Sequence, residues 1–259
     1  MKILFLGNNW VAWKILEYLK EQQENIVGLV THSTEKQKFL NELISVSGLP
    51  KEKIFNGMYI RTDETINRIR ELEPDIALSI FFNYILPNKF IKIFPEGVIN
   101  LHPAYLPFNR GQYPNVWSII NETPSGVTLH YIDDEKIDTG DIISQKEVVI
   151  EPIDTGITLY RKLELASLDI FRDTWPAIKS GDVVRKSQNV DNGTYHRTRD
   201  VVNIDKISLD KKYTGQELIN ILRARTFPPY KGAYFEEDGK RVYMRLELEY
   251  GDEQGDREE

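Results

Sequence analysis

Short apolar runs and longer amphipathic stretches alternate along the first half of the chain. Four short apolar runs predict buried strands: Lys2–Gly7, Ile26–Thr31, Asp75–Ile80 and Gly97–Leu101. Three stretches repeat apolar residues at helical spacing: Trp10–Glu24, Thr34–Val46 and Glu64–Leu72. A further short helix is expected after Pro87. This alternation predicts an α/β fold, in which helices cover both faces of a doubly wound, mostly parallel sheet.

The second half of the chain predicts the end of this domain and a smaller C-terminal region. We expect a helix over Asn115–Asn121, strands over Gly126–Ile132 and Ile142–Ile150, and a long closing helix over Ile157–Ile178. That helix has an apolar stripe through Leu159, Leu163, Leu165, Ile170 and Phe171. We therefore expect a first domain over residues 1–182, a linker and small region over 183–250, and an acidic, disordered tail over 251–259.

Within the C-terminal region, a polar linker or crossing segment over Ser187–Arg199 precedes a predicted helix over Thr214–Arg225. A turn over Thr226–Lys231 leads to a β-hairpin, whose strands are expected over Ala233–Phe235 and Arg241–Tyr250. Four apolar residues would share one face of the second strand: Val242, Met244, Leu246 and Leu248. That face would either pack as core or form a dimer surface.

Composition excludes several kinds of chemistry. The 259 residues include no cysteine, so disulfides, a thiol nucleophile and a cysteine zinc site are excluded, and no metal-ligand spacing is evident. The net charge of -7 argues against a nucleic-acid partner, although the last nine residues, with five acids and one arginine, supply -4 of it. No apolar run is long enough for a membrane span or a signal peptide, so we expect a cytoplasmic protein with no membrane partner.

The first strand-to-helix turn argues against the common nucleotide-binding motifs. It reads Gly7-Asn8-Asn9-Trp10-Val11-Ala12, with one glycine where a dinucleotide fold shows G-x-G-x-x-G, and the chain has no Walker sequence. Asn8, Asn9 and Trp10 either line a ligand cleft at the helix N-terminus or form a helix cap and a packed indole.

The segment Ile99–Gly111 holds an amide and an imidazole two positions apart. If Val98–His102 is a strand, its period of two sends Asn100 and His102 to the same face. Pro103 and Pro107 prevent a continued ladder, so the pair would lie at the carboxyl end of a strand, where open α/β sheets bind ligands. A structural asparagine and a structural histidine at a strand end are the alternative.

Several short motifs follow one another in a specific order. They are Asn100, His102-Pro103, Leu106-Pro107, Gly126-Val127-Thr128-Leu129-His130 and Asp138-Thr139-Gly140-Asp141. In this order and spacing the chain resembles the 10-formyltetrahydrofolate-dependent formyltransferases over roughly residues 1–180. The resemblance implies a Rossmann-like formyltransferase fold, 10-formyltetrahydrofolate as formyl donor and no metal. Asn100, His102 and Asp138 match the Asn-His-Asp catalytic set of that family.

The chemistry suits these residue types. Formyl transfer to an amine passes through a tetrahedral intermediate whose oxygen gathers negative charge, and Asn100 and His102 can each donate an N–H to it. Asp138 would orient His102 or a bridging water, and His102, Asp138 or water must take the proton of the attacking amine. The resemblance also implies a folate pocket formed by Phe82, Asn83, Tyr84, Ile85 and Leu86, together with Asp134, Lys136, Asp138 and Asp141.

The stretch Asn109–Trp117 is similar to the sugar N-formyltransferases. The implied acceptor is the amine of a nucleotide-linked sugar, best a dTDP-linked 3- or 4-amino dideoxyhexose, and the implied assembly is a homodimer. Candidate substrate-binding residues are Asn9, Trp10, Tyr105, Arg110, Gln112, Tyr113, Asn115 and Tyr230. Two alternatives stay open: an enzyme similar to the methionyl-tRNA formyltransferases, and a non-catalytic nucleotide-sugar-binding protein.

Overall fold

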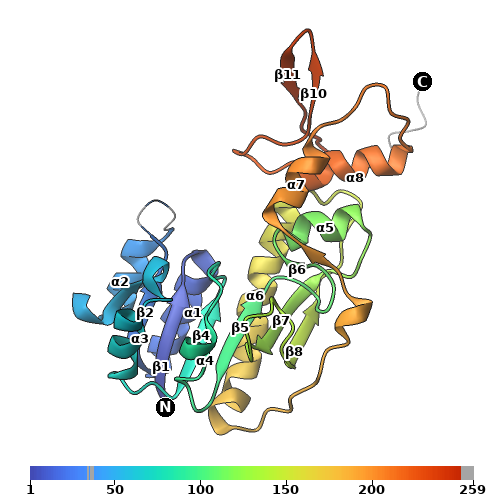
Figure 1. The fold of residues 1–259 in the computed structure, drawn as a ribbon. Coiled ribbons are helices and arrows are strands. Elements are labelled where there is room, and N and C mark those ends of the chain that lie inside the picture. Colours follow the sequence, from blue (N-terminus) through green and yellow to red (C-terminus); the bar gives the residue numbers. More distant parts are fainter. Residues whose placement is uncertain (34, 36–37, 252–259) are drawn as a thin grey trace.

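A seven-stranded mixed sheet forms the centre of the computed structural model, which describes residues 1–33, 35 and 38–251. The strands are β1 (Lys2–Gly7), β2 (Asn25–Thr31), β3 (Ile54–Asn56), β4 (Ile76–Ile80), β5 (Val98–His102), β7 (Gly126–Tyr131) and β8 (Ile142–Glu147). Their order is β3-β2-β1-β4-β5-β7-β8 (Figure 1). Strands β1 to β5 are parallel, and β7 and β8 add antiparallel strands at one edge. The mostly parallel sheet is therefore confirmed.

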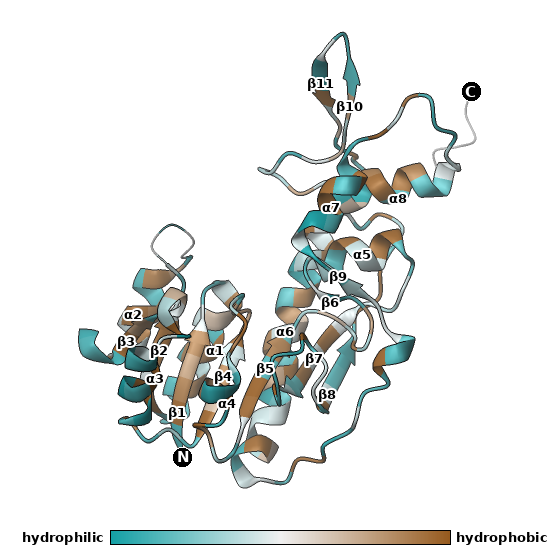
Figure 2. Cartoon of the chain, in the orientation of Figure 1, coloured by the Kyte–Doolittle hydropathy of each residue, from teal (hydrophilic) through white to brown (hydrophobic). Residues whose placement is uncertain are grey.

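Helices cover both faces of the sheet, as a doubly wound fold requires. On one face lie α1 (Trp10–Glu21), α2 (Leu40–Ser47) and α6 (Gly156–Ser180), and on the other lie α3 (Asp63–Arg70) and α4 (Asn88–Ile91). Because side chains alternate along a strand, Ile3 and Phe5 of β1 pack into the first layer, and Leu4 and Leu6 into the second. The apolar colour of β1, β4 and β5 in Figure 2 follows from this burial on two sides.

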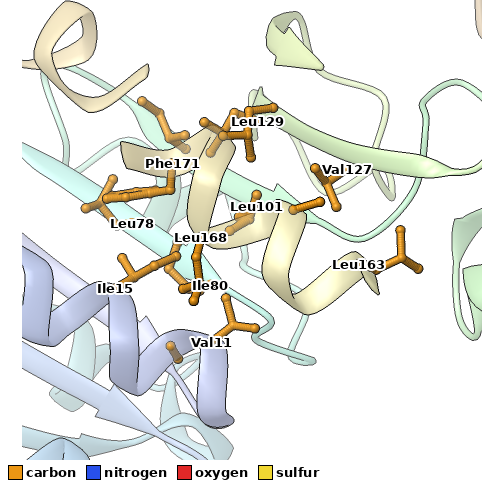
Figure 3. Packing of buried hydrophobic residues seen from close by; sticks show 14 of the residues in the cluster. Val11, Ile15, Leu78, Ile80, Leu101, Val127, Leu129, Leu163, Leu168 and Phe171 are labelled. Atoms are coloured by element: carbon orange, nitrogen blue, oxygen red, sulfur yellow. The ribbon is translucent and has the colours of Figure 1, made fainter. Parts of the chain in front are cut away.

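The long helix α6 closes the first layer. Thr155 caps its N-terminus, and Gly181 ends it in the left-handed conformation. Leu163 and Phe171 pack against the residues of β4 and β7 (Figure 3). Leu165, which the sequence assigned to the same stripe, is 58% exposed. At 100° per residue it lies about 200° around the helix from Leu163, so its assignment to the buried face was wrong.

Several element ends differ from the sequence prediction. Helix α1 ends at Glu21 rather than Glu24, because Gln23 adopts a positive φ and Glu24 turns inward to accept the Trp175 indole N–H at 3.0 Å. Within the predicted helix Thr34–Val46, residues 34, 36 and 37 lie outside the described part of the chain, and the helix observed begins at Leu40. The short strand β3 has no apolar run long enough to predict it. Helix α5 spans Pro114–Ile120, and three 3-10 turns span Lys51–Lys53, Gly57–Tyr59 and Val190–Asn192.

The C-terminal region lies beyond one end of the sheet (Figure 1). Its elements are β9 (Tyr195–His196), which pairs in parallel with β6 (Arg110–Gly111), then α7 (Thr198–Asp205), α8 (Gly215–Arg225), β10 (Tyr234–Glu237) and β11 (Lys240–Tyr243). The crossing segment and hairpin are confirmed, whereas α7 was not predicted. Of the residues in the structure, no helix is long and apolar enough to span a membrane.

The second hairpin strand ends earlier than predicted, at Tyr243 rather than Tyr250. Its partner β10 begins at Tyr234, so later residues have no strand to pair with. The chain instead runs past the end of α8, where Leu246 N–H donates to Thr226 Oγ1 at 2.9 Å. The predicted common face of Val242, Met244, Leu246 and Leu248 is therefore not a strand face.

Candidate active site

A cavity of about 490 Å³ opens at the carboxyl ends of the central strands. Its wall includes the residues that follow these strands directly: Asn8 after β1, Phe81 after β4 and Pro103 after β5. The strand order reverses between β1 and β4, and open α/β sheets bind ligands at such a reversal.

Asn100 and His102 line this cavity from the carboxyl-terminal end of β5. Both are buried, with 8% of each exposed. In the antiparallel pair of β5 and β7, Asn100 faces His130 and His102 faces Thr128, so all four side chains share one face of the sheet. The same-face prediction for Asn100 and His102 is thus confirmed, and it extends to a second histidine.

His130 fixes the orientation of the Asn100 amide. Its Nδ1 lies 2.8 Å from the Tyr131 carbonyl oxygen, which can only accept, so Nδ1 carries a hydrogen. In the neutral ring Nε2 is then an acceptor, and it lies 3.0 Å from Asn100 Nδ2. Asn100 therefore donates one amide hydrogen to His130, and the second hydrogen of Nδ2 is left for a ligand in the cavity.

Asp138 completes the cluster from the loop between β7 and β8. Its Oδ2 lies 3.5 Å from His102 Nε2 and accepts the Gly111 N–H at 2.9 Å, while Oδ1 lies 3.6 Å from His130 Nε2. Burial alone would raise the pKa of Asp138, but His102, His130 and the Gly111 N–H outweigh burial and lower it, so the group is a carboxylate at pH 7.

The pKa of His102 is lowered, mainly by burial, although the Asp138 charge and a hydrogen bond with the Asn109 backbone partly oppose the shift. The ring is therefore neutral at pH 7. Its Nε2 has no hydrogen-bond partner among the described residues, so the nitrogen bonded to Asn109 is Nδ1. A neutral imidazole with an available Nε2 beside a carboxylate can take up a proton and be stabilised as an ion pair.

Most of the predicted folate residues line the cavity. Phe82, Asn83, Tyr84, Ile85 and Leu86 all line it, as do Asp134, Lys136 and Asp138. His32, which follows β2, supports this loop: its Nε2 accepts the Asn83 N–H at 3.2 Å, and its ring packs 5.1 Å from Phe82 and 4.9 Å from Tyr84. Asp141 is not a lining residue, and its carboxylate pairs with Arg185 at 3.0 Å.

Half of the predicted acceptor residues line the same cavity. Asn9, Gln112, Tyr113 and Asn115 line the cavity, whereas Trp10, Tyr105, Arg110 and Tyr230 are not among its lining residues. Asn9 also caps α1, since its Oδ1 accepts the Ala12 N–H at 3.0 Å, so both interpretations of this residue hold. Arg110 donates to the Val190 carbonyl at 3.4 Å, and Tyr230 is 57% exposed.

The lining or supporting residues missed from the sequence include His32, His130, Tyr160, Tyr195 and His196. His130 could have been predicted from the sequence. Thr128 and His130 are polar residues two positions apart in a predicted strand, just as Asn100 and His102 are in the preceding one. His32 follows a predicted strand, as the other site residues do. Tyr160 lies in α6, and Tyr195 and His196 lie in β9. The sequence pattern around these residues does not indicate that they line a cavity.

Comparison with known proteins identifies the family of the chain. Residues 1–173 match the formyl transferase family, and residues 200–250 match the dimerization C-terminal domain of N-formyltransferases. The chain belongs to the formyl transferase family. This formyl transferase is 30% identical over 265 residues to the methionyl-tRNA formyltransferase of Bacillus pumilus, a match that covers 98% of this chain and 81% of that protein.

Solved structures give the same fold. A sugar N-formyltransferase from Shewanella superposes with a TM-score of 0.82 at 26% identity, covering 97% of this chain and 99% of that one. A formyltransferase from Anoxybacillus kamchatkensis, solved with UDP-4,6-dideoxy-4-formamido-L-AltNAc and tetrahydrofolate, has a TM-score of 0.58 at 28% identity, covering 78% of this chain and 89% of that one. The formyl transferase described here is therefore an enzyme of a family whose formyl donor derives from folate. Over the described residues, no group of three or more acidic and histidine side chains could hold a metal ion.

Proposed function

We propose that this formyl transferase moves the formyl group of 10-formyltetrahydrofolate to the primary amine of a nucleotide-linked sugar. A dTDP-linked 3- or 4-amino dideoxyhexose is the best candidate. The observation that supports the proposal is that Asn100, His102 and Asp138 line one cavity, together with the loop 82–86 and several tyrosine and amide side chains. A cavity of about 490 Å³ lies within the usual range for small-molecule sites.

The donor side suits a flat pterin. Ile85 and Leu86 supply apolar wall, and the aromatic group of His32, Phe82 and Tyr84 stiffens the backbone of the loop. A rigid backbone edge can pair with the hydrogen-bonding edge of the ring, while apolar side chains cover its faces. Binding of tetrahydrofolate by the solved relative from Anoxybacillus supports this assignment.

In the proposed reaction the amine nitrogen attacks the formyl carbon, and the formyl oxygen becomes an oxyanion. The second Nδ2 hydrogen of Asn100 donates to that oxyanion. His102 Nε2 takes the proton that the amine loses, and Asp138 stabilises the resulting imidazolium from 3.5 Å. The bond from the formyl carbon to N10 of the folate then breaks, and N10 takes up the proton that His102 received, which returns the imidazole to its neutral form. Charges and protons balance without a metal or a redox partner.

The acceptor side favours a compact polar ligand with a ring system. Tyr113, Tyr160 and Tyr195 offer stacking faces, and Asn9, Gln112 and Asn115 offer amide groups. The net charge of -7 opposes the binding of tRNA, whose phosphates require a basic face. Similarity to the methionyl-tRNA formyltransferase of Bacillus pumilus keeps that acceptor as the second candidate. The match of residues 200–250 to a dimerization domain supports a homodimer.

An acceptor panel tests this assignment. Purified protein and 10-formyltetrahydrofolate are mixed with dTDP- and UDP-linked amino sugars, uncharged tRNA and methionyl-tRNA, and the release of tetrahydrofolate is followed. We expect release with at least one amino-sugar nucleotide and none with either tRNA. Turnover with methionyl-tRNA alone would replace the sugar acceptor, and a lack of turnover with every acceptor, while the nucleotide sugars still bind, would support the non-catalytic alternative.

A further inference from the structure

A stretch of chain that belongs to neither matched family region runs along both loops of the catalytic cluster. Residues 185–196, which overlap the crossing segment predicted over 187–199 and carry its name from here on, lie between the two matched regions, which end at residue 173 and begin at residue 200. The crossing segment first follows the loop that carries Asp138 and then the loop after His102. Both loops are largely irregular, so their backbone groups need partners from elsewhere.

The first half of the crossing segment is bonded to the Asp138 loop at several points. Lys186 and Ile142 exchange two backbone hydrogen bonds, of 2.7 and 2.9 Å. Arg185 pairs with Asp133 at 2.6 Å and with Asp141 at 3.0 Å, at the two ends of the loop. Between these points, Gln188 Nε2 donates to the carbonyl oxygens of Asp138, at 3.3 Å, and Gly140, at 2.5 Å.

One of the hydrogen bonds from Gln188 holds the backbone of Asp138, which has an uncommon conformation. Asp138 has a φ of 53°, in the left-handed region, which a residue other than glycine keeps only when its surroundings impose it. In this conformation the carbonyl of Asp138 points to Gln188 while its carboxylate points to Gly111 and His102. Release of the carbonyl would allow the peptide to rotate and would carry the carboxylate away from His102.

The second half of the crossing segment holds the other partner of Asp138. Thr194 accepts the Asn109 N–H at 2.7 Å, and the backbone of His196 accepts the Gln112 N–H at 2.9 Å. Gly111 lies between these two contacts, and its own N–H donates to Asp138 Oδ2 at 2.9 Å. The segment therefore acts on Asp138 from both ends, directly through Gln188 and indirectly through Gly111.

We propose that Gln188 is a positioning residue for formyl transfer, which holds the backbone of Asp138 so that its carboxylate faces His102. The inference rests on the proposed function in so far as it takes Asp138 to be part of the catalytic set. Gln188 itself does not line the cavity and touches no reacting atom.

Gln188→Met tests this role, because methionine keeps the length of the side chain and removes the donor. Gln145→Met is the matched control: Gln145 is also half-buried and donates through Nε2, to the Leu106 carbonyl at 2.7 Å and to Thr128 Oγ1 at 3.1 Å. Displacement of a catalytic group by a fraction of an ångström to one ångström costs roughly ten- to a hundredfold in rate. We expect that loss in kcat for Gln188→Met, while the KM values for the formyl donor and for the acceptor stay within about twofold of the native values. For Gln145→Met we expect a kcat close to native.

A second variant separates loss of the donor from loss of folding. Gln188→Lys keeps a donor that can reach both carbonyls, so its kcat should stay within about threefold of the native value. Equal kcat values for the Lys and Met variants, or for Gln188→Met and Gln145→Met, would overturn the proposal.

A titration gives a readout that needs no acceptor. The charge of Asp138 raises the pKa of His102, so Asp138→Asn should lower the midpoint of the His102 ring resonance in NMR spectra, with the resonance assigned by its loss in His102→Asn. Gln188→Met should move the midpoint in the same direction by a smaller amount, and Gln145→Met should leave it in place. If the acceptor panel shows no turnover but this shift is present, the formyl-transfer assignment fails and the positioning by Gln188 stands. An unmoved midpoint in Gln188→Met would refute the positioning.

Discussion

Asp138→Asn isolates the charge that the proposed mechanism places beside His102. The substitution keeps the size of the side chain and an oxygen that can accept the Gly111 N–H. At 3.5 Å and an effective dielectric constant of about 20, a carboxylate and an imidazolium attract by about 5 kcal/mol. Because about 1.4 kcal/mol corresponds to a tenfold change in rate, complete loss of this attraction would slow the step by three to four orders of magnitude.

Water and the remaining amide dipole will replace part of this attraction, so we expect kcat to fall by about a hundred- to a thousandfold. The donor KM should change little, because the proposed site of the pterin is the loop 82–86. The assay is the release of tetrahydrofolate under saturating donor and acceptor. Asp169→Asn, which removes a surface carboxylate paired with Lys146, serves as the control and should keep the native rate. A kcat within threefold of native for Asp138→Asn would refute the role of its charge.

Further predictions concern the neighbouring groups. Asn100→Ala removes the proposed oxyanion donor and should lower kcat by about a hundred- to a thousandfold with little change in the far-UV circular dichroism spectrum; a native rate would show that the amide does not contact the reacting oxygen. The free energy of unfolding should fall on acidification, first below pH 6.5 for His102 and again below pH 3.8 for Asp138. Folding lowers the pKa of both groups, so the unfolded chain takes up their protons at a higher pH than the folded chain does. Urea unfolding at several pH values measures this, and a His102→Asn variant with an equally steep loss between pH 7 and 5 would contradict the assignment to His102. Gly111→Ala should lower both the melting temperature and kcat, since Gly111 has a φ of 89° and an added Cβ would lie 2.3 Å from the His196 carbonyl oxygen; an unchanged melting temperature would argue against this packing.

Much of the proposed catalytic cluster was predictable because it depends on local periodicity. The alternation along β5 brings Asn100 and His102 to one face, and the prolines after it end the strand at the edge of the sheet. The apolar runs of β1, β2 and β4 likewise reveal a parallel sheet, because buried strands have few other residue choices. Asp138 was found through the order of its motif rather than through any local pattern, since its position depends on a loop held from outside.

The crossing segment shows why the rest was not predictable. Residues 187–199 look like a linker, because hydrogen bonds to other loops require only short polar side chains and backbone groups. Gln188, Tyr195 and His196 reach the site through contacts with partners about 50 to 85 residues earlier in the chain. Similarly, the hairpin strand after Tyr243 has a strand-like alternation but no neighbour to pair with, and tertiary structure overrides the pattern.

A crystal structure of the protein with tetrahydrofolate and a nucleotide-linked amino sugar would test the central claim most directly. We predict the pterin against residues 82–86, and the sugar amine and N10 of the folate on opposite sides of the Asn100, His102 and Asp138 cluster. The amine should lie within hydrogen-bond reach of His102 or of a water bound to it. A sugar amine bound away from this cluster, or a pterin on the wall of Tyr113, Tyr160 and Tyr195, would contradict the proposed site.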